Sequence, residues 1–183
     1  MRVIKLGGSL TQSGQLIACL NHIADSAAQQ TVIVPGGGEF ANQVRLAQQQ
    51  WAFNDYAAHH MAILAMQQMA LLLNALQPDW RLLNSLDALA RHHSISIWFP
   101  EIALLNQQAI PASWAITSDS LAAWLAGKLS ATTLELIKSA PCPANTSLKA
   151  FVEQGILDTA FLNYSQPHCY KISILNSHDF LHQ

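Results

Sequence analysis

Two short stretches decide the fold of this chain: residues 3–10 are VIKLGGSL, and residues 31–40 are TVIVPGGGEF. In each, a run of apolar and β-branched residues of strand length ends at a cluster of glycines. A helix is expected after each cluster, because apolar residues recur with helical spacing over residues 15–28 and Glu39 supplies an acidic first turn to the next segment. The order strand, glycine loop, helix predicts parallel strands with helices packed on their faces.

The remainder of the chain continues this alternation. Residues 55–76 contain no Gly or Pro and are rich in Ala, Leu and Met, which predicts one long helix. Further elements are expected as strands near 81–83, 95–99, 134–137 and 160–162, and as helices over 117–131 and 148–153. The stretch 170–175 fits either a helix or a strand. We therefore predict an α/β fold, a three-layer sandwich with a mostly parallel central sheet, and treat residues 1–183 as a single domain.

Composition excludes several classes of protein. Of the 183 residues, 51% are hydrophobic and only 11% are charged, with a net charge of −2, so the chain lacks the basic surface that nucleic acid requires. No apolar run reaches about 18 residues, which argues against a membrane span. No secretory leader is apparent, and the three cysteines are scattered, so we expect a cytoplasmic protein with free thiols.

The glycine clusters predict an anion site. Five of the eight glycines lie in them, and both clusters follow strands, at the sheet edge where ligands bind in open α/β folds. Free amides in such loops can hold a phosphate group, although the glycines could also serve only to make tight turns. Neither GxxxxGK[ST] nor GxGxxG is present. Lys5, two residues before the first cluster, would be costly to bury unless its charge met an anion.

Three segments resemble the amino acid kinase superfamily and its carbamate kinase-like fold: VIKLGGSL at 3–10, VPGGGEFANQVR at 34–45 and ITSDSLAAWLAGKL at 116–129. The segments GGGEFAN at 36–42 and WAITSDS at 114–120, with Asp55 and the following HHMA at 59–62, are most similar to the kinases of methanofuran biosynthesis, which act on [5-(aminomethyl)furan-3-yl]methyl phosphate.

The resemblance implies that the γ-phosphoryl group of ATP passes to a phosphomonoester, with Mg²⁺ arriving on the nucleotide rather than in a protein metal site. It assigns catalytic roles to Lys5 and Asp119, and a nucleotide-side position to Lys138. The expected phosphate-binding residues are Gly7, Gly8, Ser9, Gly36, Gly37 and Gly38, and those expected to line the acceptor site are Asp55, His59 and Ser118. The partner would be a small molecule, and the long apolar helix suggests a homodimer.

Plainer interpretations stand beside these roles. Asp119 could be an ordinary acidic residue at a helix start, Lys138 a surface lysine, and Asp55 with His59 an exposed pair. Arg45 could meet an acceptor phosphate, although a solvated side chain is the favoured interpretation. The apolar residues of the long helix are expected to lie in the core: Met61, Leu64, Ala65, Met69, Leu72 and Leu73.

The resemblance weakens after residue 137, where KSAPCP replaces the turn usual in the superfamily. We therefore interpret residues 1–131 as a phosphoryl- and acceptor-binding part and residues 132–183 as a reduced nucleotide-side part. Two functions remain open: a small-molecule kinase, and a non-catalytic binding or assembly subunit that has lost productive ATP binding. A uridylate or isopentenyl phosphate kinase is a weaker alternative.

Overall fold

The computed structural model describes residues 1–26, 30–166 and 170–182. Within these residues the strands form one six-stranded sheet, ordered β3-β4-β2-β1-β5-β6, in which every neighbouring pair is parallel. The strands are β1 (Arg2–Leu6), β2 (Thr31–Pro35), β3 (Arg81–Leu83), β4 (Ile95–Trp98), β5 (Thr133–Lys138) and β6 (Lys171–Asn176). The β1 strand is therefore central, with β2 and β5 on its two sides.

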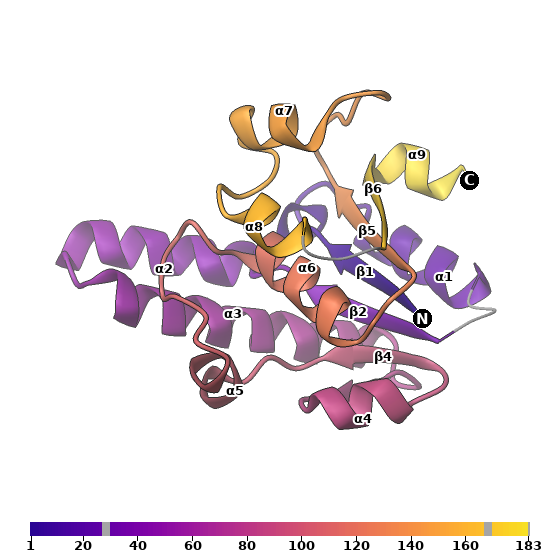
Figure 1. Cartoon of the computed structure of the whole chain (residues 1–183), viewed down its shortest axis with the longest axis horizontal. Coiled ribbons are helices and arrows are strands. Elements are labelled where there is room, and N and C mark those ends of the chain that lie inside the picture. Colours follow the sequence, from indigo (N-terminus) through magenta and orange to yellow (C-terminus); the bar gives the residue numbers. More distant parts are fainter. Residues whose placement is uncertain (27–29, 167–169, 183) are drawn as a thin grey trace.

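Helices cover both faces of this sheet, so the chain is a three-layer α/β sandwich (Figure 1). They are η1 (Gly8–Leu10), α1 (Leu16–Ser26), α2 (Gly38–Trp51), α3 (Asp55–Leu76), α4 (Leu86–Arg91), α5 (Ile102–Gln107), α6 (Ser118–Lys128), α7 (Leu148–Glu153), α8 (Phe161–Ser165) and α9 (Ser177–Leu181). No helix in the described ranges has both the length and the apolar composition needed to cross a bilayer.

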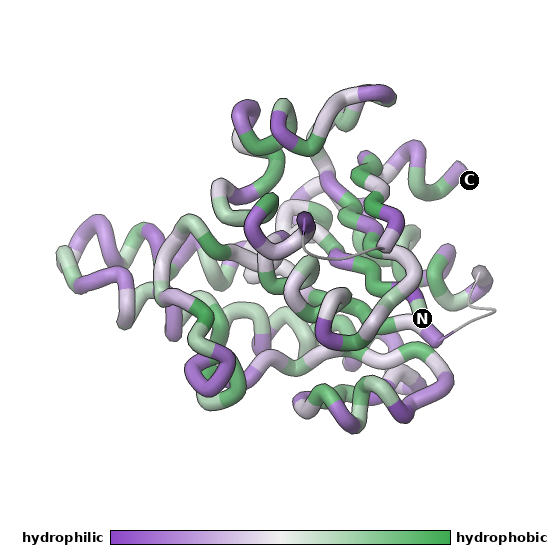
Figure 2. Tube along the Cα trace, viewed as in Figure 1, coloured by the Kyte–Doolittle hydropathy of each residue, from purple (hydrophilic) through white to green (hydrophobic). Residues whose placement is uncertain are grey.

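Alternate residues of each strand face opposite layers, as a pleated strand requires. Val3 and Leu136 pack against α6, α7 and α8 on one face, whereas Ile4 and Ile137 pack against α1 and α9 on the other. The hydrophobic residues follow the strands and the inward faces of the helices in Figure 2. Lys5 has the parity of Val3, so its side chain lies on the face that α6 covers.

The predicted alternation of strands and helices is confirmed over most of the chain. One predicted strand is wrong, and the segment that fitted either a helix or a strand is a strand. Residues 160–162 begin helix α8 rather than a strand, because Phe161 and Ser165, one helical turn apart, are both buried. Such a short apolar run does not distinguish the two periodicities. The undecided stretch after residue 169 forms β6. The end of the first expected helix and Cys169 lie outside the described residues.

The expected core stripe of α3 is only half correct. Ala65, Met69 and Leu73 are buried, whereas Met61, Leu64 and Leu72 are 38%, 46% and 37% exposed. Their exposure follows from the packing of α3, which uses one face against α2 and the sheet, while no layer formed by the described residues lies over its other face.

Candidate active site

The two glycine loops lie in direct contact at the carboxyl edge of the sheet. The amide of Gly7 donates to the Ile137 carbonyl and that of Gly36 to the Leu6 carbonyl, both at 2.9 Å, so these two amides extend the sheet. A Cβ on Gly36 would lie 2.5 Å from the Gly8 amide nitrogen. Glycine is therefore required here first for backbone-to-backbone packing between the loops.

Four further amides of the loops remain available to a ligand. Within the part of the chain that the structure describes, the N–H groups of Gly8, Ser9, Gly37 and Gly38 donate to no backbone oxygen. The same four residues line a cavity of about 220 Å³. The N-terminus of α2 begins at Gly38, so its dipole adds to the attraction for an anion.

We expect Gly36→Ala to destabilise the fold by about 3 kcal/mol, because two backbone segments would have to move apart. Urea unfolding measures this free energy. Gly14→Ala is the matched control: nothing lies within 4 Å of its Cβ position, and it carries only the strain of φ +71°, about 1 kcal/mol. Equal losses in the two variants would show that the loops are not held by this contact.

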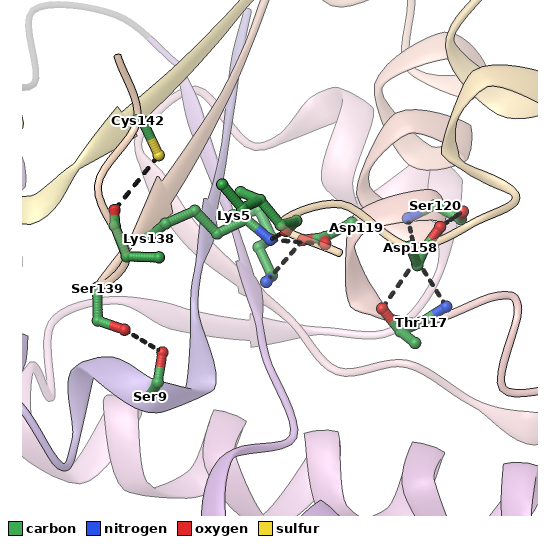
Figure 3. Close-up of polar contacts among 11 residues, drawn as sticks. Lys5, Ser9, Thr117, Asp119, Ser120, Lys138, Ser139, Cys142 and Asp158 are labelled. Atoms are coloured by element: carbon green, nitrogen blue, oxygen red, sulfur yellow. Dashed lines mark hydrogen bonds and ion pairs between the residues drawn. The ribbon is translucent and has the colours of Figure 1, made fainter. Parts of the chain in front are cut away.

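Two lysines and one carboxylate meet beside the glycine loops (Figure 3). Lys5 Nζ lies 2.7 Å from Asp119 Oδ1, and Lys138 Nζ lies 2.6 Å from Asp119 Oδ2. The sheet explains the meeting: Lys5 is in register with Leu136 on β5, so Lys138, two residues further, points to the same face. Asp119 comes from the first turn of α6, which packs on that face.

The cluster is nearly closed to solvent, with side-chain exposures of 6% for Lys5 and Asp119 and 12% for Lys138. Burial alone would raise the pKa of the Asp119 carboxyl, but Lys5 and Lys138 outweigh it and hold that pKa below its usual value. Burial lowers the pKa of Lys138 to about 8, with Lys5 lowering it further and Asp119 opposing. Lys138 is thus an integral part of the cluster rather than a surface lysine.

The structure separates the three residues expected to line the acceptor site. His59 and Ser118 line the cavity. Asp55 is exposed outside it and accepts a 2.8 Å hydrogen bond from Gln48 Nε2. Burial lowers the pKa of His59, whose Nδ1 lies 3.3 Å from the Ser113 carbonyl oxygen, so its ring is neutral near pH 7.

Arg45 is exposed to solvent, as the favoured sequence interpretation has it, and it also lines the cavity. Its Cζ lies 3.7 Å from the centroid of the Trp114 ring, a cation–π contact. The Trp114 Nε1–H donates to Gln48 Oε1 at 2.6 Å. Asp55 is therefore connected to the cavity through Gln48, which bonds both to Asp55 and to the Trp114 ring under Arg45.

Sequence reasoning also missed Ser139 and Asp158. The Ser9 and Ser139 hydroxyls share a 2.6 Å hydrogen bond, which ties the first glycine loop to the segment after β5. Asp158 bonds to the start of α6. Neither residue lies in a recognisable motif, and both contacts join segments distant in the sequence, so no local pattern could have revealed them.

The donor set suits phosphate oxygens better than a bare cation. Free amides and two ammonium groups are anion ligands, and the central carboxylate already contacts both lysines. Among the described residues, no group of three or more His, Cys, Asp or Glu side chains could hold a metal ion. The fold and the site thus define a class of protein that carries a donor set suited to an anion at the carboxyl edge of a parallel sheet.

The chain belongs to the amino acid kinase family, which matches it over residues 1–141. A relative from Methanocaldococcus jannaschii, named [5-(aminomethyl)furan-3-yl]methyl phosphate kinase, is 34% identical over 136 residues, or 70% of this chain. The match spans 61% of that relative's length.

Solved structures at lower identity share the fold. Uridylate kinase from Archaeoglobus fulgidus has a TM-score of 0.70 at 16% identity, covering 99% of this chain and 94% of its own. UMP kinase from Bacillus anthracis has a TM-score of 0.71 at 14% identity, covering 97% of this chain and 87% of its own. Aspartate kinase from Synechocystis has a TM-score of 0.67 at 15% identity, covering 97% of this chain and 38% of its own.

Proposed function

We propose that this protein is a small-molecule kinase that transfers the γ-phosphoryl group of ATP to a phosphomonoester. The observation that carries the proposal is the Lys5–Asp119–Lys138 cluster beside the free amides of the glycine loops. Phosphoryl transfer spreads negative charge over the equatorial oxygens of a loose transition state, so catalysis depends on positioned cations and N–H donors. This site concentrates both in one place.

The residues fit ATP with its magnesium. Lys5, Lys138 and the amides of Gly8 and Gly37 would hold the phosphate oxygens, while Asp119 keeps the two ammonium groups in position. Mg²⁺ would arrive with the nucleotide and neutralise charge between its phosphates. Residues 1–131 would bind the phosphoryl group and the acceptor, and residues 132–183 would form a reduced nucleotide side, together in a single domain.

The cavity suits an acceptor with one anionic and one flat apolar part. Arg45 has no acidic partner within the described ranges, so its charge is available to a phosphate group. Ile63, Met66 and Leu121 supply apolar lining. The name of the M. jannaschii relative points to an aminomethylfuran phosphate, which has both features, and we propose it as the acceptor.

The test is direct. The protein is incubated with ATP, Mg²⁺ and a series of phosphomonoesters that includes the aminomethylfuran phosphate, and the products are measured by mass spectrometry. Formation of ADP and a diphosphate supports the proposal. ATP binding by calorimetry without any diphosphate would favour the non-catalytic binding subunit instead.

We expect Arg45→Gln to raise KM for the phosphomonoester by about 30-fold, because a charge-assisted hydrogen bond is lost. Arg91→Gln is the matched control, since Arg91 is an exposed arginine paired with Asp87 at 2.9 Å. Steady-state kinetics with the acceptor varied at saturating ATP measures the effect. An unchanged KM in Arg45→Gln would remove Arg45 from the acceptor site.

We further propose a homodimer through the uncovered face of α3. The exposed residues of that face are Met61, Leu64, Leu71, Leu72 and Leu76. Exposed large apolar side chains gathered on one helix face are typical of an interface. Light scattering is expected to give about twice the chain mass of 20.0 kDa, and Leu64→Glu is expected to halve it, whereas Ile17→Glu, at an exposed position of α1, leaves it unchanged. A wild-type monomer would contradict the proposal.

A further inference from the structure

The carboxylate of Asp158 holds the first turn of α6 from outside the helix. Its Oδ2 accepts hydrogen bonds from the Thr117 amide at 2.8 Å, the Thr117 hydroxyl at 2.8 Å and the Ser120 amide at 3.0 Å. Its Oδ1 accepts from the Ser120 hydroxyl. Figure 3 shows the carboxylate facing both residues, to one side of the lysine cluster.

These bonds replace the usual cap of the helix. Thr117 stands at the N-cap position, yet its side chain caps no amide of α6 and donates to Asp158 instead. One carboxylate accepts hydrogen bonds from two amides that the helix itself leaves unpaired. Its negative charge also interacts favourably with the positive end of the helix dipole. Asp119 lies between the two residues that Asp158 holds, so the direction of its side chain depends on this clamp.

The turn that carries Asp158, residues 156–160, also contacts Lys138, the second lysine of the cluster. Lys138 Nζ donates to the Ile156 carbonyl at 2.6 Å, and the Ala160 amide donates to the Ala115 carbonyl at 3.0 Å. Residues 156–160 thus contact both the helix that carries Asp119 and the lysine that pairs with it. The whole turn lies after residue 141, where the match to the amino acid kinase family ends.

We propose that Asp158 is a positioning residue for phosphoryl transfer, acting through Asp119 and Lys138. It keeps the first turn of α6 in the orientation that places Asp119 between the two lysines. The inference rests on the proposed kinase function and deepens it, because it assigns a role at the Lys5–Asp119–Lys138 cluster to a residue outside the region that matches the family. Asp158 does not itself line the cavity; it bonds to Thr117, which does, and to Ser120, so its effect is transmitted through the residues it holds.

Electrostatics provides a readout that a purely structural role would not change. The charged and titratable groups facing Lys138 are Lys5 on β1, Asp119 on α6, Asp158 in the α7–α8 turn and the Cys142 thiol. Burial is the main cause of the lowered pKa of Lys138, about 8, and Asp158 opposes it. Removing the Asp158 charge therefore lowers this pKa further, so the ammonium form is lost at lower pH.

The experiment compares Asp158→Ala and Asp158→Asn with Asp87→Asn, a control at an exposed carboxylate of α4. The oxygen of asparagine can still accept from the two amides and the Thr117 hydroxyl, and its NH2 group can donate to the Ser120 hydroxyl, so it preserves the clamp without the charge. The acceptor is the phosphomonoester that gives the highest wild-type turnover. Amide hydrogen exchange at Thr117 and Ser120 is followed in the same samples.

We expect Asp158→Ala to lower kcat about 100-fold, with KM for ATP and acceptor changed less than threefold, and to expose both amides to exchange. Asp158→Asn should recover about tenfold of the loss and protect the amides. In both variants the alkaline limb of the kcat–pH profile should move to lower pH.

Two results would overturn the proposal while leaving the kinase function intact: a wild-type kcat in Asp158→Ala, or an unmoved alkaline limb with activity lost only in proportion to unfolded protein. A wild-type protein that forms no diphosphate would instead defeat the kinase function, and with it the role of Asp158.

Discussion

Replacing Lys5 with alanine is expected to lower kcat for phosphoryl transfer by at least about 1,000-fold, the scale on which a single cation contributes to this reaction. Lys5 is the cation closest in sequence to the glycine loop, and its Nζ is held at 2.7 Å from Asp119. A neutral side chain removes that charge from a site almost closed to water, where bulk ions cannot replace it. The amides of the loop remain, so some activity above the uncatalysed rate should persist.

The matched control is Lys149→Ala, since Lys149 is 79% exposed and makes only a 3.7 Å pair with Glu153 one turn along α7. Lys5→Arg separates charge from geometry, because a planar guanidinium does not reproduce the position of an ammonium group. Single-turnover measurements at saturating ATP report the chemical step. A kcat for Lys5→Ala within tenfold of the control would refute the catalytic role of Lys5.

Asp119→Ala is expected to cost about 3–5 kcal/mol of folding free energy at pH 7, because it leaves two buried ammonium groups without their counter-ion. The loss should shrink as the pH rises. Without Asp119 the pKa of Lys138 in the folded state falls further below its unfolded value, so the unfolded chain binds more protons and stability increases with pH. Urea unfolding at pH 7 and pH 9 measures both the loss and its recovery.

Asp87→Ala, at a carboxylate that is 70% exposed, should change the unfolding free energy by less than about 1 kcal/mol. Asp119→Asn keeps the shape and removes the charge, so it should be nearly as unstable as the alanine variant. If both Asp119 variants were as stable at pH 7 as at pH 9, the folded variants would bind as many protons as the unfolded chain. The buried lysines would then keep their charge without Asp119, and the electrostatic account of the site would be wrong.

The glycine loops and their strands could be predicted from sequence because their signals are local. A β-branched run that stops at glycine is complete within ten residues. The long helix over residues 55–76 is predicted by its composition alone. The meeting of Lys5 with Asp119 was expected only through the motifs they share with a family. Lys138 needed one more fact, the register of β5 on β1, which decides which face its side chain occupies.

Other parts of the site depend on contacts that sequence does not encode locally. Asp55 and His59 share a helix face, yet of the two only His59 lines the cavity, whereas Asp55 lies outside it and bonds to the amide of Gln48. Asp158 lies 38 residues from Ser120 along the chain, and nothing near it predicts a helix cap for another segment. The uncovered stripe of α3 has the same composition as a core stripe, so composition cannot separate the two.

The strand order has a consequence for how the protein is made. One edge of β1 is filled by β2 early in synthesis, whereas the other edge must wait for residues 133–138 of β5. A chain still on the ribosome therefore presents an open strand edge beside its first glycine loop, and open edges recruit other chains. The segment that closes this edge ends in Lys138 and is followed by Asp158, so the nascent protein gains protection from aggregation and its complete charged centre late in synthesis.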